Sequence, residues 1–240
     1  MKGWQSSESA RHYMRVAEVV IPNRHEILGM VAELTVCIGG EQPRILDLGC
    51  GHGDVTAAIL EKSPRGDFCL VDFSDAMLEA SRERFADNPR VRILKHDLDE
   101  GLPEQSSTAP FDVIVSAFAL HHVDPQARLP LFAGIHDSLR AGGALILTDR
   151  FRAESETLAT WEFDSWIEWM TNRIREHFDP QVSVAQVRER QLASEKKLGD
   201  KPGTLWETEQ DLRDAGFVHV DCVAKHSILG TVVAAKGGRR

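Results

Sequence analysis

The sequence has little cysteine, few positive charges and no long hydrophobic run among its 240 residues. The four cysteines are scattered and form no CxxC pair, which argues against a disulfide framework and against a zinc ribbon. The polar N-terminal stretch MKGWQSSESARHYMRV has no apolar signal region, and no run elsewhere is long enough to cross a bilayer. We therefore expect a cytoplasmic protein with no membrane partner.

Positive charge is the scarcer sign, because 28 Lys and Arg residues stand against 37 Asp and Glu residues, for a formal net charge of -9. Such a surface repels the phosphate groups of nucleic acids, so no nucleic-acid partner is expected. With 42% hydrophobic and 27% charged residues, the composition is that of a globular chain rather than a disordered or fibrous one. The length favours one domain over residues 1–240.

Short apolar runs and amphipathic stretches alternate from residue 44 onward. Each run is nearly continuous in Val, Ile, Leu and Phe, which is typical of parallel strands covered on both faces. The pattern predicts an α/β fold with a doubly wound, mostly parallel sheet. The predicted strands are 44–48, 68–72, 91–94, 112–118 and 144–149. The predicted helices between them are 54–61, 75–85 and 127–139, the last of them ended by Gly142-Gly143.

The two ends of the chain and one long insertion depart from this alternation. Helical patterns precede the first strand within residues 1–40, and Pro22 separates them. Residues 151–205 are helical and aromatic, and we expect these two segments to form a helical cap over a substrate. Apolar runs at 217–224 and 228–236 close the chain and predict an antiparallel hairpin at the sheet edge, giving seven strands in all.

The most informative segment is ILDLGCGHGD, in which an apolar strand runs into three glycines and then into a helix. Glycine lets the backbone approach a ligand closely, but the spacing here is GxGxG rather than GxGxxG. The carboxylate of Asp54 at the helix N-terminus would oppose a pyrophosphate. Asp72 ends the second strand 19 residues after Gly53, where doubly wound folds place the acid that accepts ribose hydroxyls. A nucleoside with little or no phosphate is favoured.

These residues resemble the class I S-adenosylmethionine-dependent methyltransferases. DLGCGHG is similar to the first motif of that family, VDFSDAML to its second, HDLDEGLP to its third and FDVIVSAFALHHV to its fourth. LRAGGALILTDRF is similar to the segment that leads into the fifth strand. The resemblance covers residues 44–150, and it implies a Rossmann-like methyltransferase fold with S-adenosylmethionine as cofactor.

The resemblance also implies a set of cofactor contacts. Asp47 would help to hold the amino group, Asp72 the ribose diol, and Phe73 one face of the adenine. Carboxylates and aromatic faces suit a cationic sulfonium. The implied cofactor-binding residues are Asp47, Gly49, Cys50, Gly51, Gly53, Asp72, Phe73, Met77, Asp97, Leu98 and Ser116.

Two residues are candidates for catalysis. Methyl transfer is an in-line displacement that depends mainly on positioning and on exclusion of water, so a base is optional. His121, near the carboxyl end of the fourth strand, is the predicted base, with packing or capping as its alternative. Tyr13, the only tyrosine, is predicted to contact the cofactor or the substrate, or simply to pack. No metal site is expected on His121, His122 and Asp124, because neighbouring side chains diverge.

The predicted substrate-binding residues are Trp161, Trp166 and Arg150. The tryptophans share one helical segment that could wall an aromatic pocket, with core packing or a homodimer contact as the alternative. Ser116-Ala-Phe-Ala stands where base-amino methyltransferases carry an Asn/Asp-Pro-Pro-aromatic tetrapeptide. We therefore expect an oxygen, nitrogen or activated carbon acceptor on a small molecule.

Three other functions stay open. IPNRHEILGMVAEL, the helical insertion and the closing AGF region also resemble the carboxy-S-adenosylmethionine synthases, although DLGCGHG departs from their DLGCSLG-type motif. A non-catalytic S-adenosylmethionine-binding protein would keep the same pocket. A nicotinamide dehydrogenase is the fourth hypothesis, and Asp54 opposes it.

Overall fold

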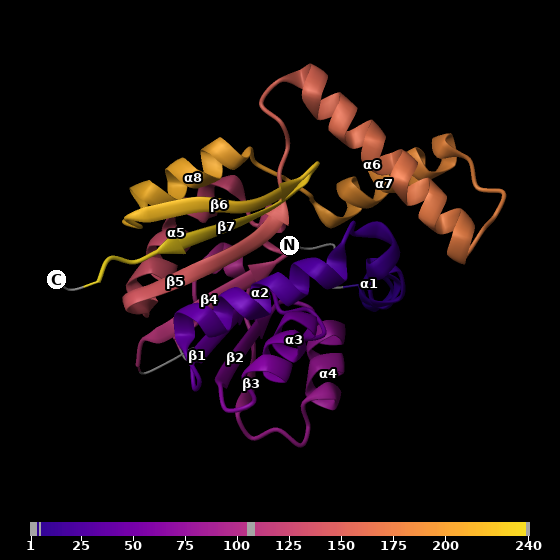
Figure 1. The fold of residues 1–240 in the computed structure, drawn as a ribbon. Coiled ribbons are helices and arrows are strands. Elements are labelled where there is room, and N and C mark those ends of the chain that lie inside the picture. The colour runs from indigo at the N-terminus through magenta and orange to yellow at the C-terminus, as the bar shows by residue number, and fades with distance from the viewer. Residues whose placement is uncertain (1–3, 5, 105–108, 239–240) are drawn as a thin grey trace.

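The computed structural model describes residues 4, 6–104 and 109–238, and within them one seven-stranded sheet organises the chain (Figure 1). The strands are β1 (Arg44–Leu48), β2 (Asp67–Asp72), β3 (Val91–Lys95), β4 (Phe111–Ala117), β5 (Leu139–Arg150), β6 (His219–His226) and β7 (Leu229–Ala235). Their order is β3-β2-β1-β4-β5-β7-β6. The strands from β1 to β5 pair in parallel, whereas β7 is antiparallel to β5 and β6. The predicted doubly wound sheet with an antiparallel C-terminal pair is confirmed.

Helices cover both faces of the sheet because successive strand residues point to opposite sides. Leu46 packs in one cluster with Leu131, whereas its neighbour Ile45 packs in another with Leu28. In the described part of the chain, no helix is both long enough and apolar enough to span a membrane. The helices are α1 (Ser7–Val20), α2 (Arg24–Gly39), α3 (Asp54–Lys62), α4 (Asp75–Arg84), α5 (Pro125–Ser138), α6 (Glu156–His177), α7 (Val184–Leu198) and α8 (Leu205–Asp214), with short 3-10 turns η2 (Leu98–Glu100) and η4 (Leu120–His122).

The strand order reverses at β1, which has β2 on one side and β4 on the other. In doubly wound sheets, the connections leave such a point in opposite directions, so a crevice opens at the carboxyl ends of the two central strands. The glycine turn follows β1, and η4 follows β4. The topology therefore brings these two loops together at one edge of the sheet.

The predicted last residue of the helix, 139, agrees with the structure to within one residue, but the prediction that Gly142-Gly143 ends the helix is wrong. α5 ends at Ser138, and β5 already begins at Leu139, so both glycines lie inside the strand. The pairing of β4 with β5 shifts register there, Gly142 has a φ of 74°, and a Cβ on Gly143 would lie 2.7 Å from the Asp112 carbonyl oxygen. The glycines permit an irregularity close to β4 rather than a helix cap.

A third hydrophobic cluster holds α1 against α6. Ala17 and Ile21 belong to it together with Trp166 and Met170. The indole Nε1 of Trp166 also donates a hydrogen bond of 3.0 Å to the Val20 carbonyl oxygen. The N-terminal helix and the insertion are therefore packed on one another, as Figure 1 shows.

The insertion leaves the sheet and returns to it at one place. Arg152 forms an isolated parallel bridge with Thr204, and its N–H donates to the Gly203 carbonyl oxygen at 3.0 Å. Both α6 and α7 lie between these two points. The segment is thus a loop closed at its base, beside the end of β5.

Candidate active site

A turn of three glycines follows β1. Gly49, Gly51 and Gly53 have φ values of 67°, 54° and 87°, in the left-handed region that glycine adopts without strain. A Cβ at Gly49 would lie 2.2 Å from the Ala119 Cβ, and one at Gly53 would lie 2.3 Å from the Phe85 ring. Both positions therefore need glycine for space as well as for conformation.

Asp72 ends β2 beside this turn, because β1 and β2 are parallel neighbours. Its carboxylate accepts the N–H groups of Gly51 and Ser74, each at 2.8 Å. Burial raises the pKa of Asp72 above its usual value, although the backbone hydrogen bonds act in the opposite direction. The glycine turn thus holds the carboxylate in one orientation.

These groups border a cavity over the glycine turn, which we call the inner cavity. Asp72 lies in its wall together with the apolar side chains of Met77 and Leu98, which are 3% and 1% exposed. The wall therefore combines one fixed carboxylate, close backbone and apolar faces. The predicted cofactor residues that border it are Gly49, Cys50, Gly51, Asp72, Phe73, Met77 and Leu98.

Asp47 does not border the inner cavity, contrary to its expected contact with an amino group. Its side chain is fully buried beneath the turn, and the Thr56 hydroxyl donates to it at 2.7 Å. Burial raises the pKa of Asp47 to about 7. The strand alternation explains this position, since Asp47 points towards α3 rather than out of the carboxyl end of β1. It supports the turn from below.

Three further predicted cofactor residues also lie outside the cavity wall. Ser116 is buried and donates to the Leu48 carbonyl oxygen at 2.8 Å, which ties β4 to β1. Asp97 caps η2 by accepting the Asp99 N–H at 3.0 Å. Gly53 begins α3 against Phe85. Each of them shapes the loops around the cavity without facing it.

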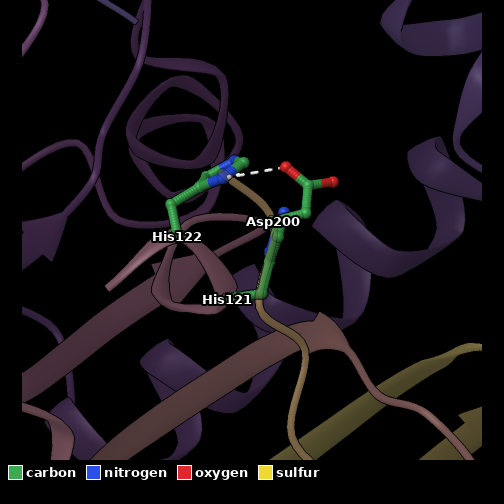
Figure 2. A group of neighbouring side chains, drawn as sticks. All are labelled: His121, His122 and Asp200. Carbon is green, nitrogen blue, oxygen red and sulfur yellow. Dashed lines mark ion pairs between the residues drawn. The ribbon is translucent and has the colours of Figure 1, made fainter. Parts of the chain in front are cut away.

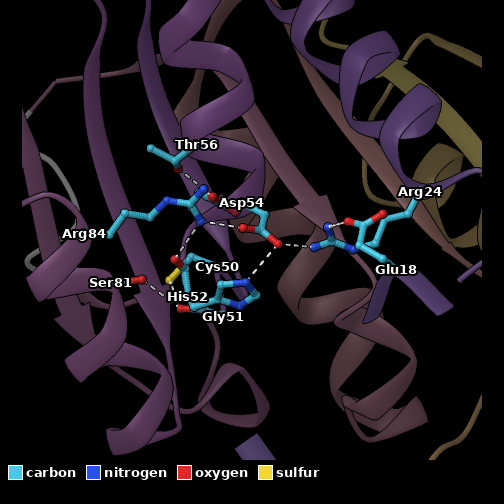
Figure 3. A network of polar contacts seen from close by, with 10 residues as sticks. Glu18, Arg24, Cys50, Gly51, His52, Asp54, Thr56, Ser81 and Arg84 are labelled. Atoms are coloured by element: carbon cyan, nitrogen blue, oxygen red, sulfur yellow. Dashed lines mark hydrogen bonds and ion pairs between the residues drawn. The ribbon is translucent and has the colours of Figure 1, made fainter. Parts of the chain in front are cut away.

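Asp54 is the centre of a charge network that the sequence does not reveal (Figure 3). It accepts hydrogen bonds from Arg24 and Arg84, and His52 Nε2 lies 2.9 Å away. Burial alone would raise the pKa of Asp54, but the contacts of His52, Arg84 and Arg24 outweigh it and hold the pKa well below its usual range. Two guanidinium groups balance the Asp54 charge, so its repulsion of a pyrophosphate is weaker than the sequence suggests.

A larger cavity adjoins the inner one, and we call it the outer cavity. It holds about 430 Å³, against about 70 Å³ for the inner cavity. Trp4, Tyr13, Phe118 and His122 border both, so the two cavities adjoin at these residues. Burial raises the pKa of the Tyr13 hydroxyl, although Arg24 lowers it. Phe118 has a φ of 58°, a strained conformation for a bulky residue, at the boundary between the two cavities.

Two of the three predicted substrate residues border the outer cavity. Trp166 is 8% exposed, and the Arg150 guanidinium lies 4.8 Å from its ring centroid. Trp161 is 62% exposed and does not border the cavity, so its predicted contact is not found. Five residues of an α-helix turn through about 140°, which places the two indoles on different faces of α6.

His121 borders the outer cavity and is held by an aspartate at the end of β5. Its Nδ1 lies 2.5 Å from Asp149 Oδ1, and its backbone N–H donates to Asp149 Oδ2 at 2.9 Å. Both side chains are nearly buried. Sequence reasoning missed Asp149, although it ends an apolar run as Asp72 does, and that repetition could have identified it.

His122 lies against His121 instead of diverging from it, so the structural reason given against a metal site is wrong. Their ring centroids are 3.9 Å apart, and His122 Nδ1 is 3.1 Å from Asp200 Oδ1 (Figure 2). Burial lowers the pKa of His122 to about 4. Asp124 instead caps α5 and pairs with Lys201 at 2.9 Å. Asp200 follows α7, and no local pattern points to it.

Three further arginines in or beside the insertion divide between the surface and the outer cavity. Arg188 pairs with Asp164 on α6, and Arg152 pairs with Glu207 at 3.6 Å. Arg190 borders the outer cavity. Its position on α7, two residues after Arg188, turns it to a different face of the helix.

Comparisons with known proteins agree with this geometry. A family model described as "Methyltransferase domain" matches residues 46–145. The carboxy-S-adenosyl-L-methionine synthase of Aeromonas salmonicida is 29% identical over 221 residues, which cover 90% of this chain and 84% of the relative.

Solved structures share the fold. Human N-acetylserotonin methyltransferase in complex with S-adenosylmethionine has a TM-score of 0.62 at 18% identity, over 98% of this chain and 57% of that one. This chain thus spans little more than half of the human enzyme. A TehB-like S-adenosylmethionine-dependent methyltransferase from Corynebacterium glutamicum has a TM-score of 0.59 at 19% identity, over 96% of this chain and 97% of that one. The glycine turn, Asp72, the matching family model and these similarities together support a class I S-adenosylmethionine-dependent methyltransferase.

Proposed function

We propose that this methyltransferase methylates an oxygen, nitrogen or activated carbon nucleophile on a small anionic molecule held in the outer cavity. The observation that carries the proposal is the position of that cavity. It shares Trp4, Tyr13, Phe118 and His122 with the inner cavity and lies beside the carboxyl end of β4. An acceptor there would meet a ligand of the inner cavity across these four side chains.

The inner cavity suits S-adenosylmethionine. Asp72 keeps oxygen lone pairs for the ribose hydroxyls beyond its two backbone hydrogen bonds, and the two glycines in the wall leave room for close contact. Met77 and Leu98 offer an apolar face to the adenine. When bound, the cofactor supplies an electrophilic methyl group whose carbon–sulfur bond breaks as an acceptor lone pair attacks, leaving S-adenosylhomocysteine.

The anionic character of the acceptor follows from the charges around the outer cavity. Arg15, Arg190 and Lys197 border it and make no ion pair within the described residues. Arg150 is balanced by Glu195 at 2.7 Å. Glu8 also borders the cavity, so three cations stand against one carboxylate besides the paired Arg150 and Asp200, and this excess of positive charge favours an anion in a chain of net charge -9.

In this proposal, the two histidines of η4 activate the nucleophilic atom of the acceptor. His121 and His122 border the outer cavity, and the Asp149 contact fixes the tautomer and orientation of the His121 ring. Tyr13 and Phe118 limit access of water from the inner side. The residues thus position the acceptor and keep its lone pair directed towards the inner cavity.

A product analysis tests the proposal. Purified protein is incubated with methyl-labelled S-adenosylmethionine and a metabolite extract, and the labelled product is identified by mass spectrometry. We expect an anionic small molecule that has gained one methyl group. Label found only in protein or nucleic acid would overturn the small-molecule assignment, and a product whose unmethylated acceptor is neutral would overturn the anionic one.

Two adjacent lysines of α7 provide a matched test of the charge argument. Lys197 borders the outer cavity and Lys196 does not, although both are exposed. We expect Lys197→Gln to raise KM for the acceptor roughly fivefold, as the loss of about 1 kcal/mol implies. Lys196→Gln should leave KM unchanged, and equal effects of the two substitutions would contradict a specific role for the cavity.

Carboxy-S-adenosylmethionine synthesis is the second candidate function. The observation that favours it is the similarity to curated synthases over most of this chain. The same mass-spectrometric experiment separates the two, because a synthase would yield a carboxylated S-adenosylmethionine and no methylated acceptor.

A further inference from the structure

Two histidines and one aspartate converge at the wall of the outer cavity (Figure 2). One ligand atom from each of His121, His122 and Asp200 lies within 4.8 Å of the other two. The histidines come from η4, whereas Asp200 comes from the segment after α7. The Lys201 N–H donates to the His121 carbonyl oxygen at 2.8 Å, so backbone contact holds the two segments together.

The facing atoms of His122 and Asp200 are buried and contact each other. Nδ1 and Oδ1 are 3.1 Å apart, at ion-pair distance, and neither atom has another hydrogen-bond partner within the described residues. The two side chains are only 6% and 8% exposed. Burying a polar pair costs desolvation free energy, and a cation bound by both atoms would offset this cost. Donors on one zinc-like ion, with bonds of about 2.0–2.2 Å, lie roughly 3–3.5 Å apart, which matches the observed separation.

His121 has the arrangement of a supported metal ligand. Asp149 occupies its Nδ1, which leaves Nε2 as the nitrogen with a free lone pair. A carboxylate on the distal nitrogen is the usual support of a metal-bound histidine, because it fixes the tautomer and the ring orientation. The neighbouring cation, Arg150, is 3.4 Å from Asp200 Oδ2 and is also paired with Glu195, so Asp200 Oδ1 stays available.

From this geometry we infer that His121, His122 and Asp200 bind a divalent transition-metal ion of the zinc or cobalt type. Two imidazoles and one carboxylate suit these ions, whereas Mg²⁺ and Ca²⁺ prefer sites built from oxygen alone. All three residues border the outer cavity, so the ion is open to a molecule bound there. Coordination of an acceptor oxygen lowers its pKa and exposes a nucleophilic lone pair. This role rests on the proposed methyl transfer, but the metal binding does not.

Cobalt(II) is the probe for the test. Tag-free, full-length protein is treated with EDTA, dialysed and titrated with Co²⁺ by calorimetry and by visible absorption. We expect one equivalent to bind, and we expect Asp200→Asn and His122→Gln to weaken binding at least tenfold. His136→Gln is the matched control, since His136 also lies beside a carboxylate, Asp137 at 3.2 Å, but has no third ligand. It should bind Co²⁺ as the unsubstituted protein does.

Two further measurements keep the inference falsifiable if a variant fails to fold. X-ray absorption of the Co²⁺-loaded, unsubstituted protein should show two imidazole ligands. Binding of S-adenosylhomocysteine, measured with and without Co²⁺, reports separately on the inner cavity, so failure of the proposed function is distinguishable. Absence of saturable Co²⁺ binding, binding unchanged in folded Asp200→Asn, or fewer than two imidazole ligands would each overturn the metal site.

Discussion

At the scale of single residues, the acids at the strand ends divide into two roles. Asp72 faces the inner cavity, whereas Asp47 lies beneath the glycine turn and supports it. Both carboxylates are buried enough to have raised pKa values. Substitutions at the two positions should therefore have different effects, one on binding and the other on stability.

Asp72→Ala should weaken the binding of S-adenosylhomocysteine. Hydrogen bonds to a charged group contribute about 1.5–3 kcal/mol, so the Kd should rise roughly tenfold to a hundredfold. Isothermal titration calorimetry measures this directly. Asp75→Ala is the control, because Asp75 is exposed and pairs with Lys95. An unchanged Kd for Asp72→Ala would remove the carboxylate from the binding site.

Asp47→Asn should flatten the pH dependence of stability. The pKa of Asp47 is about 7 in the folded chain and ordinarily 3.8, so the folded state binds the proton more tightly. The stabilisation of the folded state by protonated Asp47 is complete below pH 3.8 and is lost as pH rises through 7. Between about pH 5 and 8 the free energy of unfolding should fall by on the order of 2–3 kcal/mol more in the unsubstituted protein. Urea unfolding of both proteins at the two pH values measures the difference, and parallel curves would contradict the prediction.

Part of the candidate site was predictable at this scale, because its signals are local. Asp72 and the glycines follow apolar strands directly, and this spacing predicts an acid for the ribose beside a backbone turn that a ligand can approach. Asp200 could not be predicted, since it reaches the histidines only because the segment after α7 contacts η4. The inward orientation of Asp47 was also hidden, because the sequence does not say which face of a strand end meets the ligand.

At the scale of elements, continuous apolar runs predicted the strands well, because strands that are buried on both faces are apolar at nearly every position. Residues 139–143 were the exception. Two glycines usually end a helix, and only the close approach of Gly143 to the Asp112 carbonyl shows why they belong to a strand here. This contact is with β4, which is far away in sequence, so the residues around Gly143 do not predict it.

Trp166 and Trp161 provide a matched pair within α6. Trp166→Ala should lower the free energy of unfolding by about 3 kcal/mol, since it empties buried space between α1 and α6 and removes the hydrogen bond to Val20. Trp161→Ala should change it by less than about 0.5 kcal/mol, because that indole is 62% exposed. Denaturant unfolding of the two variants measures both changes in the free energy of unfolding. Equal losses would mean that α6 does not pack as described.

At the scale of the whole molecule, the outer cavity is enclosed by segments that lie far apart in the chain. α1 contributes Tyr13 to both cavities, α7 contributes Arg190 to the outer one, and the third hydrophobic cluster joins α1 to α6. The shape of both cavities therefore depends on how α1, α6 and α7 pack outside the sheet.

Binding of S-adenosylhomocysteine should slow amide exchange in α1 and, through the shared cluster, in α6. Order imposed on Tyr13 restrains the helix that carries it, and Ala17 and Ile21 transmit this to Trp166. Hydrogen–deuterium exchange with mass spectrometry measures the change. α8 is the internal reference, since it packs on α5 and β6 away from both cavities. Protection limited to the glycine turn would show that α1 is independent of the ligand.

The bridge between Arg152 and Thr204 also bears on how the insertion could be replaced. Because the segment leaves and rejoins the sheet at one place, a segment of different length fits between these two residues without a change in strand spacing. A chimera would still need a replacement for the face of α6 that packs on α1, since α1 carries Tyr13 of the inner cavity.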